Sequence, residues 1–311
     1  MWLQKTFNLE YPVLQGGMAH VATATFAAAV SNAGAMGQIG TGAMTSSQVR
    51  DAIRQTRALT EKPFGVNIML MNPEADEIAK IIAEERVPLV TTGAGSPGRF
   101  IPMWKDAGCI VIPVVSSLSL AVRMERTGAD AVIAEGQEAG GHIGEMTSLV
   151  LWPLLSENLS IPVIAAGGLA KGSQLLAARL LGAEGFQLGT IFLATEECPI
   201  HEHYKDAVVQ ARDSQIGVIG RFNGLPCRVL KNSLARQAVE LEKHESDKMI
   251  LEQKLAGSLR RAVFDGDKVD GGFMMGLSAS LISEIKPIRQ LLEDLFEEME
   301  SAKTRCREER S

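Results

Sequence analysis

The strongest constraint on the fold is a repeated alternation of short apolar runs with amphipathic stretches. Several of the runs are continuously apolar, which is typical of strands buried on both faces of a parallel sheet. Each run ends in a glycine-rich or polar turn, as a strand–helix unit requires. The predicted strands are Pro12–Leu14, Met36–Ile39, Phe64–Ile68, Leu89–Thr92, Ile110–Val115, Ala131–Ala134, Pro162–Ala165 and Phe186–Leu188.

The stretches between these runs carry apolar residues at helical spacing, and several begin with Ser or Thr where a helix N-cap is expected. Strands that alternate with helices form either a closed barrel or an open doubly wound sheet. Polar residues and glycines follow most of the strands instead of gathering at one point, so we predict a (β/α)8 TIM barrel. The predicted helices are Thr23–Ala33, Ser46–Leu59, Pro73–Glu85, Ser117–Thr127 and Lys171–Leu181.

The pattern changes after about Thr195. His201–Arg212 reads as a helix that closes the eighth unit, Ser233–Phe264 is amphipathic, and a final helix is expected over Pro287–Ala302. We therefore predict two units: a cofactor-binding barrel over residues 1–213, and a helical lid with a C-terminal helix over residues 214–311. The full length of 311 residues suits a barrel with an added segment.

Composition argues against several function classes. The net charge is −6 and no basic stripe is visible, so nucleic-acid binding is not expected. The four cysteines form no C-x-x-C pair, and the spacing of His201 and His203 does not suit a metal site, so no structural metal is predicted. Without a signal peptide or a long apolar segment, we expect a soluble, cytoplasmic protein with no membrane association.

Two glycine turns form the strongest local signal. In α/β barrels the active site lies at the carboxyl ends of the strands, and phosphate often binds between the loops after strands seven and eight. Gly167-Gly168 and Gly189-Thr190 occupy these two loops, and glycine lets the backbone approach a phosphate closely. Each turn alone could be an ordinary tight turn, but the pair favours a phosphate site.

Two further residues stand at predicted strand ends or loops. Asn67 ends an apolar strand, and its carboxamide either caps a neighbouring loop or pairs with the edge of a planar ring. His142 lies in the glycine-rich loop Glu138–Gly144, where it is either a surface residue or a group that faces a ligand. The residues alone leave these alternatives open.

Several motifs together resemble the nitronate monooxygenase superfamily of FMN barrels, and within it most closely the class II flavoprotein enoyl-acyl-carrier-protein reductases. The resemblance covers most of residues 10–195 in order, and it rests on the segments Gln15–Ala19, Lys62–Asn67, Glu138–His142, Ile161–Gly168 and Gln187–Thr190. The reductase features include Asn67–Leu70, Val90–Gly95, Ile112–Val115, Gly141–Gly144 and Asp270–Gly272.

The resemblance implies that NADH reduces FMN, and that reduced FMN reduces a trans-2-enoyl thioester carried by acyl-carrier protein in fatty-acid elongation. It implies His142 as the catalytic residue and a homodimer as the assembly. After Gly276 the reductase pattern has Gln where this chain has Leu277 and Ser278, so no lid residue is carried over. A requirement for a monovalent cation stays open. The implied FMN contacts are Gly17, Met18, Asn67, Glu135, Gly140, Gly167, Gly168, Gln187, Gly189 and Thr190.

Other functions fit the same motifs. In a nitronate monooxygenase the same histidine would act as a base on a nitroalkane, with O2 as oxidant. An FMN-dependent NADH:quinone reductase and a non-catalytic flavin or acyl-carrier binding protein are further alternatives. A nucleotide barrel of the inosinate-dehydrogenase type needs a catalytic cysteine after strand six, where this chain has His142 instead.

Overall fold

A computed structural model describes residues 1–244 and 248–308 of the chain. Eight parallel strands are hydrogen-bonded to one another in the order β1-β9-β8-β6-β5-β4-β3-β2. A bridge between Leu14 and Met36 joins β1 to β2 and closes the sheet. The predicted (β/α)8 barrel is therefore confirmed. The strands are β1 (Val13–Gln15), β2 (Gly37–Gly40), β3 (Phe64–Met69), β4 (Leu89–Gly93), β5 (Ile110–Val115), β6 (Val132–Glu135), β8 (Val163–Ala166) and β9 (Phe186–Leu188).

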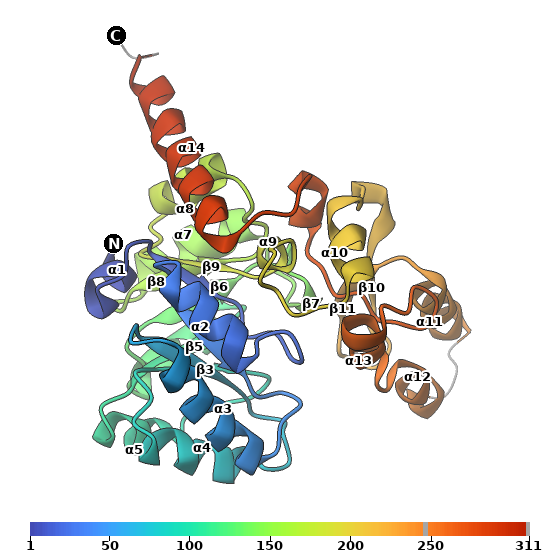
Figure 1. The fold of residues 1–311 in the computed structure, drawn as a ribbon, viewed down its shortest axis with the longest axis horizontal. Coiled ribbons are helices and arrows are strands. Elements are labelled where there is room, and N and C mark those ends of the chain that lie inside the picture. Colours follow the sequence, from blue (N-terminus) through green and yellow to red (C-terminus); the bar gives the residue numbers. More distant parts are fainter. Residues whose placement is uncertain (245–247, 309–311) are drawn as a thin grey trace.

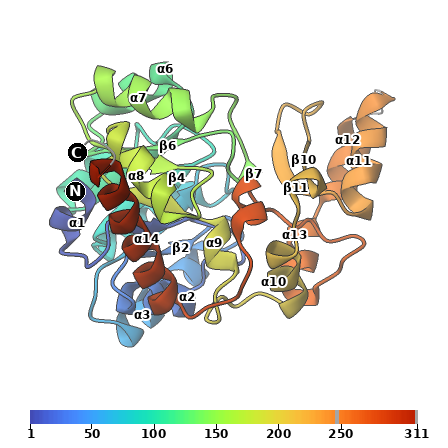
Figure 2. The same ribbon diagram turned by 90° about the horizontal axis from the view of Figure 1, so that it is seen from above.

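Helices cover the outside of the barrel (Figures 1 and 2). The Thr23, Thr45 and Ser117 hydroxyls each accept a hydrogen bond from a backbone amide in the first helical turn, as the sequence predicted for the caps at Thr23 and Ser117. Among the described residues, the helices that the sequence did not predict are α1 (Trp2–Phe7), α5 (Ile101–Asp106), α7 (Ser148–Asn158) and the short α9 (Thr190–Leu193). The predicted helices are α2 (Ala24–Asn32), α3 (Ser46–Leu59), α4 (Ala75–Glu84), α6 (Leu118–Arg126) and α8 (Gly172–Leu180).

The inside of the barrel has an apolar floor and a polar upper layer. The floor is a buried cluster that includes Leu14, Met36, Leu89, Ile133 and Ile164. Side chains two residues apart in a strand point to the same side, so the next inward positions lie closer to the carboxyl ends. These positions carry polar side chains, so groups that can form hydrogen bonds line the barrel interior at the carboxyl ends of the strands. The polar residues are Gln38, Asn67, Thr91, Glu135 and Gln187.

A second group of elements lies beside the barrel mouth (Figures 1 and 2). It contains helices, as predicted for the lid, but also a small sheet in the order β10-β11-β7, which the sequence did not predict. Strand β7 is Gly141–His142 and comes from the barrel loop after β6, so the predicted loop at His142 is in fact the edge of this sheet. The group comprises α10 (Glu202–Val209), β10 (Ile216–Ile219), β11 (Cys227–Leu230), α11 (Ser233–Lys243), α12 (Lys248–Leu255) and α13 (Ser258–Arg260).

The chain then returns to the barrel. After the 3-10 turn Leu277–Leu281, the final helix α14 (Ile288–Glu308) packs along α8. The contact is close, because a Cβ added to Gly172 would lie 2.3 Å from the Leu295 carbonyl oxygen. The mixed-charge end that the sequence shows up to Arg310 extends beyond the described residues. None of the described helices combines the length and the apolar composition that a membrane span requires.

Candidate active site

The glycines of the β1 and β9 loops bring separate strands into contact at the barrel mouth. A Cβ added to Gly17 would lie 2.2 Å from Cγ of Asn67, so only glycine lets the β1 loop lie against the β3 side chain. A Cβ on Gly16 would lie 3.4 Å from Cα of Gly189, which joins β1 to β9. The Met18 sulfur lies on the same side, 3.9 Å from a Cβ built on Gly189. Four predicted cofactor residues, Gly17, Met18, Asn67 and Gly189, thus form one continuous surface.

The turn after β8 presents unused backbone donors. Gly167 and Gly168 have φ angles of 92° and 78°, a left-handed conformation that favours glycine. Among the residues that the structure describes, none accepts a hydrogen bond from the amides of Gly167, Gly168 or Gly189. Free amides in two adjacent loops are the usual way in which a barrel holds phosphate. The geometry of these two turns therefore fits the phosphate end of FMN.

Two polar side chains of the upper layer also lack partners. The Gln187 Oε1 atom is buried and, within the described part of the chain, accepts no hydrogen bond. Glu135 lies at the end of β6, and burial raises the pKa of its carboxyl group to about 7. Buried polar atoms are normally paired, so a bound group with hydrogen-bond donors would satisfy this side of the mouth. The residues present fit FMN in this respect too.

His142 lies at the rim where the barrel meets the small sheet. It is the register partner of Cys227 on β11, and the next residue, Ile143, donates its amide to the Pro226 carbonyl at 3.0 Å. The ring is accessible to solvent, yet enough protein surrounds it that desolvation lowers its pKa. The imidazole is therefore neutral at pH 7, with one nitrogen able to donate a hydrogen bond and the other able to accept one.

A returning segment of the chain closes the mouth near two other predicted residues. The Gly276 amide donates to the Thr190 hydroxyl at 2.9 Å, and a Cβ on Gly140 would lie 2.6 Å from the Gly276 nitrogen. The Leu277 amide donates to the Glu138 carbonyl at 3.0 Å. Residues 275–277 thus hold the His142 loop against the β9 turn. Leu277 takes part through its backbone, so the missing Gln of the reductase pattern does not break this contact.

Sequence reasoning missed a buried arginine beside this loop. Arg228 on β11 is 8% exposed and donates through Nε and Nη2 to the Gln137 carbonyl, at 3.2 and 2.8 Å. Desolvation lowers its pKa, while the nearby Glu138 carboxylate raises it. Glu138 in turn accepts from the Ser148 amide and hydroxyl at the start of α7. A charged residue inside the apolar run Cys227–Leu230 was the only sequence signal for this cluster.

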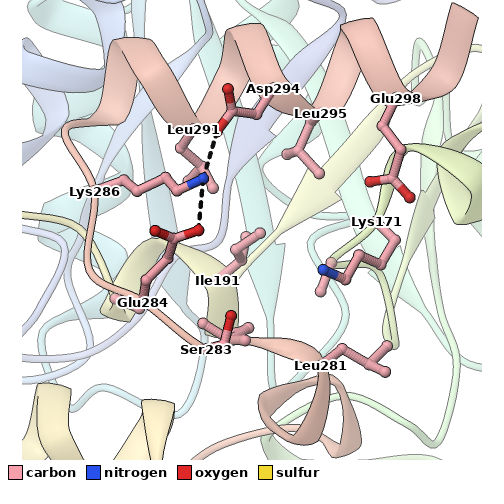
Figure 3. Close-up of a pocket in the computed structure, with 13 residues that line it drawn as sticks. Lys171, Ile191, Leu281, Ser283, Glu284, Lys286, Leu291, Asp294, Leu295 and Glu298 are labelled. Carbon is pink, nitrogen blue, oxygen red and sulfur yellow. Dashed lines mark hydrogen bonds and ion pairs between the residues drawn. The ribbon is translucent and has the colours of Figure 1, made fainter. Parts of the chain in front are cut away.

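A separate cavity lies beside the final helix α14 (Figure 3). It occupies about 80 Å³ between α14, the short helix α9 (Thr190–Leu193) and the segment before α14. Lys286 bridges Glu284 and Asp294 across one wall, and Lys171 lines the other (Figure 3). Its size matches a few water molecules and is far below the 300–1,000 Å³ usual for organic ligands, so we do not place a flavin there.

Comparisons with known proteins agree with this architecture. The sequence profile of the family described as nitronate monooxygenase matches residues 1–85 and 78–298. The structure is similar to that of FabK from Thermotoga maritima, with a TM-score of 0.96 and 49% identity over 98% of both chains.

Two sequence relatives are more distant. A probable nitronate monooxygenase of Staphylococcus aureus is 31% identical over 86% of this chain and 90% of its own. A Mycobacterium tuberculosis protein, (3aS,4S,5R,7aS)-5-hydroxy-7a-methyl-1-oxo-octahydro-1H-indene-4-carboxyl-CoA dehydrogenase, is 35% identical over 76% of this chain and 67% of its own.

Proposed function

The chain belongs to the nitronate monooxygenase family, and we propose that it is an FMN-dependent NADH:trans-2-enoyl-acyl-carrier-protein reductase. Membership of the family and the likeness to FabK indicate a flavin-dependent oxidoreductase. The finer assignment extends this to the last reductive step of fatty-acid elongation. NADH is the proposed hydride donor, acyl-carrier protein the proposed carrier, and a homodimer the proposed assembly.

The observation that carries the proposal is the match to FabK along the whole chain. It includes the small sheet beside the barrel, the strand that holds His142 and the returning segment, and not only the barrel that many activities share. Its 49% identity exceeds the 31% shared with the probable nitronate monooxygenase. A relative that is a carboxyl-CoA dehydrogenase adds support for thioester substrates in this family.

Each proposed site residue has a task that its geometry allows. The free amides of Gly167, Gly168 and Gly189, with Thr190, would hold the cofactor phosphate, while Gly17, Met18, Asn67, Glu135, Gly140 and Gln187 would line its ring and side chain. Bound FMN supplies the hydride transfer between the nicotinamide and the enoyl β-carbon. His142, neutral at pH 7, donates a hydrogen bond to the thioester carbonyl as negative charge develops on that oxygen.

The test is anaerobic. The purified protein is mixed with NADH, flavin absorbance is followed, and crotonyl thioester is then added. We expect NADH to bleach the flavin and the thioester to restore it. Lack of bleaching by NADH, together with bleaching by a nitronate, would overturn the proposal.

His142→Ala gives the residue-level test. Loss of a group that stabilises developing charge typically costs about 100-fold or more in turnover, so we expect thioester reduction to fall by that amount. Bleaching by NADH should change little, because hydride transfer to the flavin does not need the thioester carbonyl. His244→Ala is the matched control, since that histidine is exposed at the end of α11. Equal loss in both half-reactions would contradict the assigned role.

Nitronate oxidation is the second candidate, and the family profile favours it. The two reactions demand different protonation states of His142. A base must be unprotonated, so nitroalkane oxidation that depends on His142 would decline as the pH falls through the lowered pKa of the imidazole. A hydrogen-bond donor to the thioester carbonyl works in both states. Acid loss of thioester turnover that disappears in His142→Gln would therefore count against the donor role.

A further inference from the structure

A buried chain of polar side chains runs across strands β2, β3 and β4 below the barrel mouth. Asn67 Nδ2 donates to the Thr91 hydroxyl at 2.9 Å, and the Thr91 hydroxyl donates to Gln38 Oε1 at 2.7 Å. The Gln38 Nε2 atom donates in turn to the backbone carbonyl of Gln15. Gln38 and Thr91 are fully buried, so water does not compete for these bonds.

The direction of every bond in this chain is set from its far end. The Gln15 carbonyl can only accept, so the Gln38 amide must turn its Nε2 toward β1 and its Oε1 toward Thr91. The single hydroxyl proton of Thr91 is then committed to Gln38. The Thr91 oxygen can therefore only accept a hydrogen bond from Asn67. This forces the Asn67 Nδ2 atom to point toward Thr91 and its Oδ1 atom to point toward the barrel mouth.

The Asn67 Oδ1 atom is left available at the proposed cofactor site. Among the residues that the structure describes, none donates a hydrogen bond to it, and it is not sealed from solvent. It lies against Gly17, where a Cβ would approach it to 2.6 Å. A carboxamide that could rotate freely would present its NH2 group half of the time; this one presents only an acceptor.

We propose that Thr91 and Gln38 are positioning residues that lock the Asn67 carboxamide with its oxygen toward the cofactor. The oxygen then selects a ring edge that carries an N–H group, as the pyrimidine portion of an oxidised flavin does. This inference rests on the FMN site proposed above. It adds two residues that do not touch the cofactor and act only through Asn67.

The test is a double-mutant cycle on FMN affinity, measured by quenching of flavin fluorescence on titration of flavin-free protein. Thr91→Val keeps the shape of the side chain and removes the hydroxyl. One lost neutral hydrogen bond is worth about tenfold in affinity, so we expect FMN to bind about tenfold more weakly to Thr91→Val. Thr91→Ser keeps the hydroxyl and should bind within about twofold of the wild type.

The same change is then made in an Asn67→Ala background. Because Thr91 acts only through Asn67, we expect Thr91→Val to have no further effect there. An equal loss in both backgrounds would mean that Thr91 merely supports the fold, and the inference would be wrong. So would unchanged affinity in Asn67→Ala itself. If wild-type protein binds no FMN at all, it is the proposed function that fails.

Gln38→Met provides a second route should Thr91→Val fail to fold. It frees the Thr91 proton, so Asn67 can turn over and FMN affinity should fall by about threefold to tenfold, again only while Asn67 is present. If Gln38→Met lowers FMN affinity equally with and without Asn67, the inference that Gln38 acts through Asn67 is wrong. The visible spectrum of bound flavin is a readout besides activity, and its peak positions should shift in Thr91→Val and return in Thr91→Ser.

Discussion

The two sides of the barrel mouth differ in how far their polar groups are satisfied. On the side of β2, β3 and β4, the Gln38, Thr91 and Asn67 side chains bond to one another and to the backbone, and the unpaired buried atom next to them is Gln15 Nε2 on the adjoining β1. On the side of β6, β8 and β9, the half-buried Glu135 carboxyl group has no partner that stabilises its charge, and Gln187 Oε1 accepts no bond from any described residue. The glycine amides of the β8 turn are equally unused.

This difference separates two tasks. The bonded side is rigid before any ligand arrives, because its orientation is fixed from the Gln15 carbonyl upward. The open side carries polar groups without hydrogen-bond partners, which costs free energy, and hydrogen bonds to a bound ligand would offset that cost. The bonded side is suited to recognising the ring of a cofactor, and the open side is suited to binding its phosphate end.

The largest effect is expected from closing the open side. In Gly167→Ala the new Cβ would lie 2.8 Å from the Gly136 carbonyl oxygen, at a φ of 92° that alanine rarely adopts. Strain and displacement of the turn should cost about 2–3 kcal/mol in stability and about 100-fold or more in FMN affinity. Thermal unfolding of flavin-free protein and flavin titration measure the two separately.

Gly108→Ala is the matched control for Gly167→Ala. Its φ of 84° imposes the same backbone strain, but nothing lies within 4 Å of the added Cβ and the residue is remote from the mouth. It should lose about 1 kcal/mol of stability and none of its flavin affinity. Wild-type flavin affinity in Gly167→Ala would show that the β8 turn does not grip the cofactor, and the comparison between the two sides would fail.

The parts of the fold that have a local sequence pattern could be predicted, and the parts that depend on distant segments could not. The barrel strands are short, mostly apolar runs, so each could be recognised without knowing its partners. Helix α7 was not predicted because it contains Pro153 and carries apolar residues on all of its faces, which hides the helical periodicity. Strand β7 has two residues and exists only because β11 pairs with it, so no local pattern could predict it.

The same distinction applies to the candidate site. Glycine turns after predicted strands identified Gly167, Gly168 and Gly189, because a missing side chain is visible in the sequence. Thr91 and Gln38 read as ordinary strand residues, and their role depends on three strands lying side by side in register. The contact of Gly276 with Thr190 likewise needs the chain to return from the small sheet.

Glu135→Gln should have the next largest effect, which is a change in how the stability of the folded protein depends on pH. The carboxyl group is protonated in the folded state up to a pKa of about 7, whereas in the unfolded chain it ionises near 4.5. The folded state therefore binds more protons between these values, and its stability falls as the pH rises from about 4.5 to 7. Gln removes this decline, which should amount to about 1–3 kcal/mol.

The measurement for Glu135 is the melting temperature of flavin-free protein between pH 5 and pH 8. The melting temperature of the wild type should fall below that of Glu135→Gln by an amount that grows with pH and then levels off above about pH 7. Glu145→Gln, an exposed carboxylate in the neighbouring loop, should follow the wild type throughout. A constant difference across the range would mean that Glu135 is already satisfied without a ligand, which would weaken the contrast between the two sides.

The smallest effect is expected at Gln187, and it has opposite signs in the two states of the protein. Gln187→Met keeps the length of the side chain and removes an unpaired buried acceptor, so flavin-free protein should be equally stable or slightly more stable. Flavin affinity should fall by about fivefold, because the bound group loses one partner. The same substitution on the bonded side, Gln38→Met, should lower stability instead, since it removes two buried hydrogen bonds, one from the Thr91 hydroxyl and one to the Gln15 carbonyl. If both variants destabilise flavin-free protein equally, the two sides of the mouth do not differ in the way that their hydrogen bonds indicate.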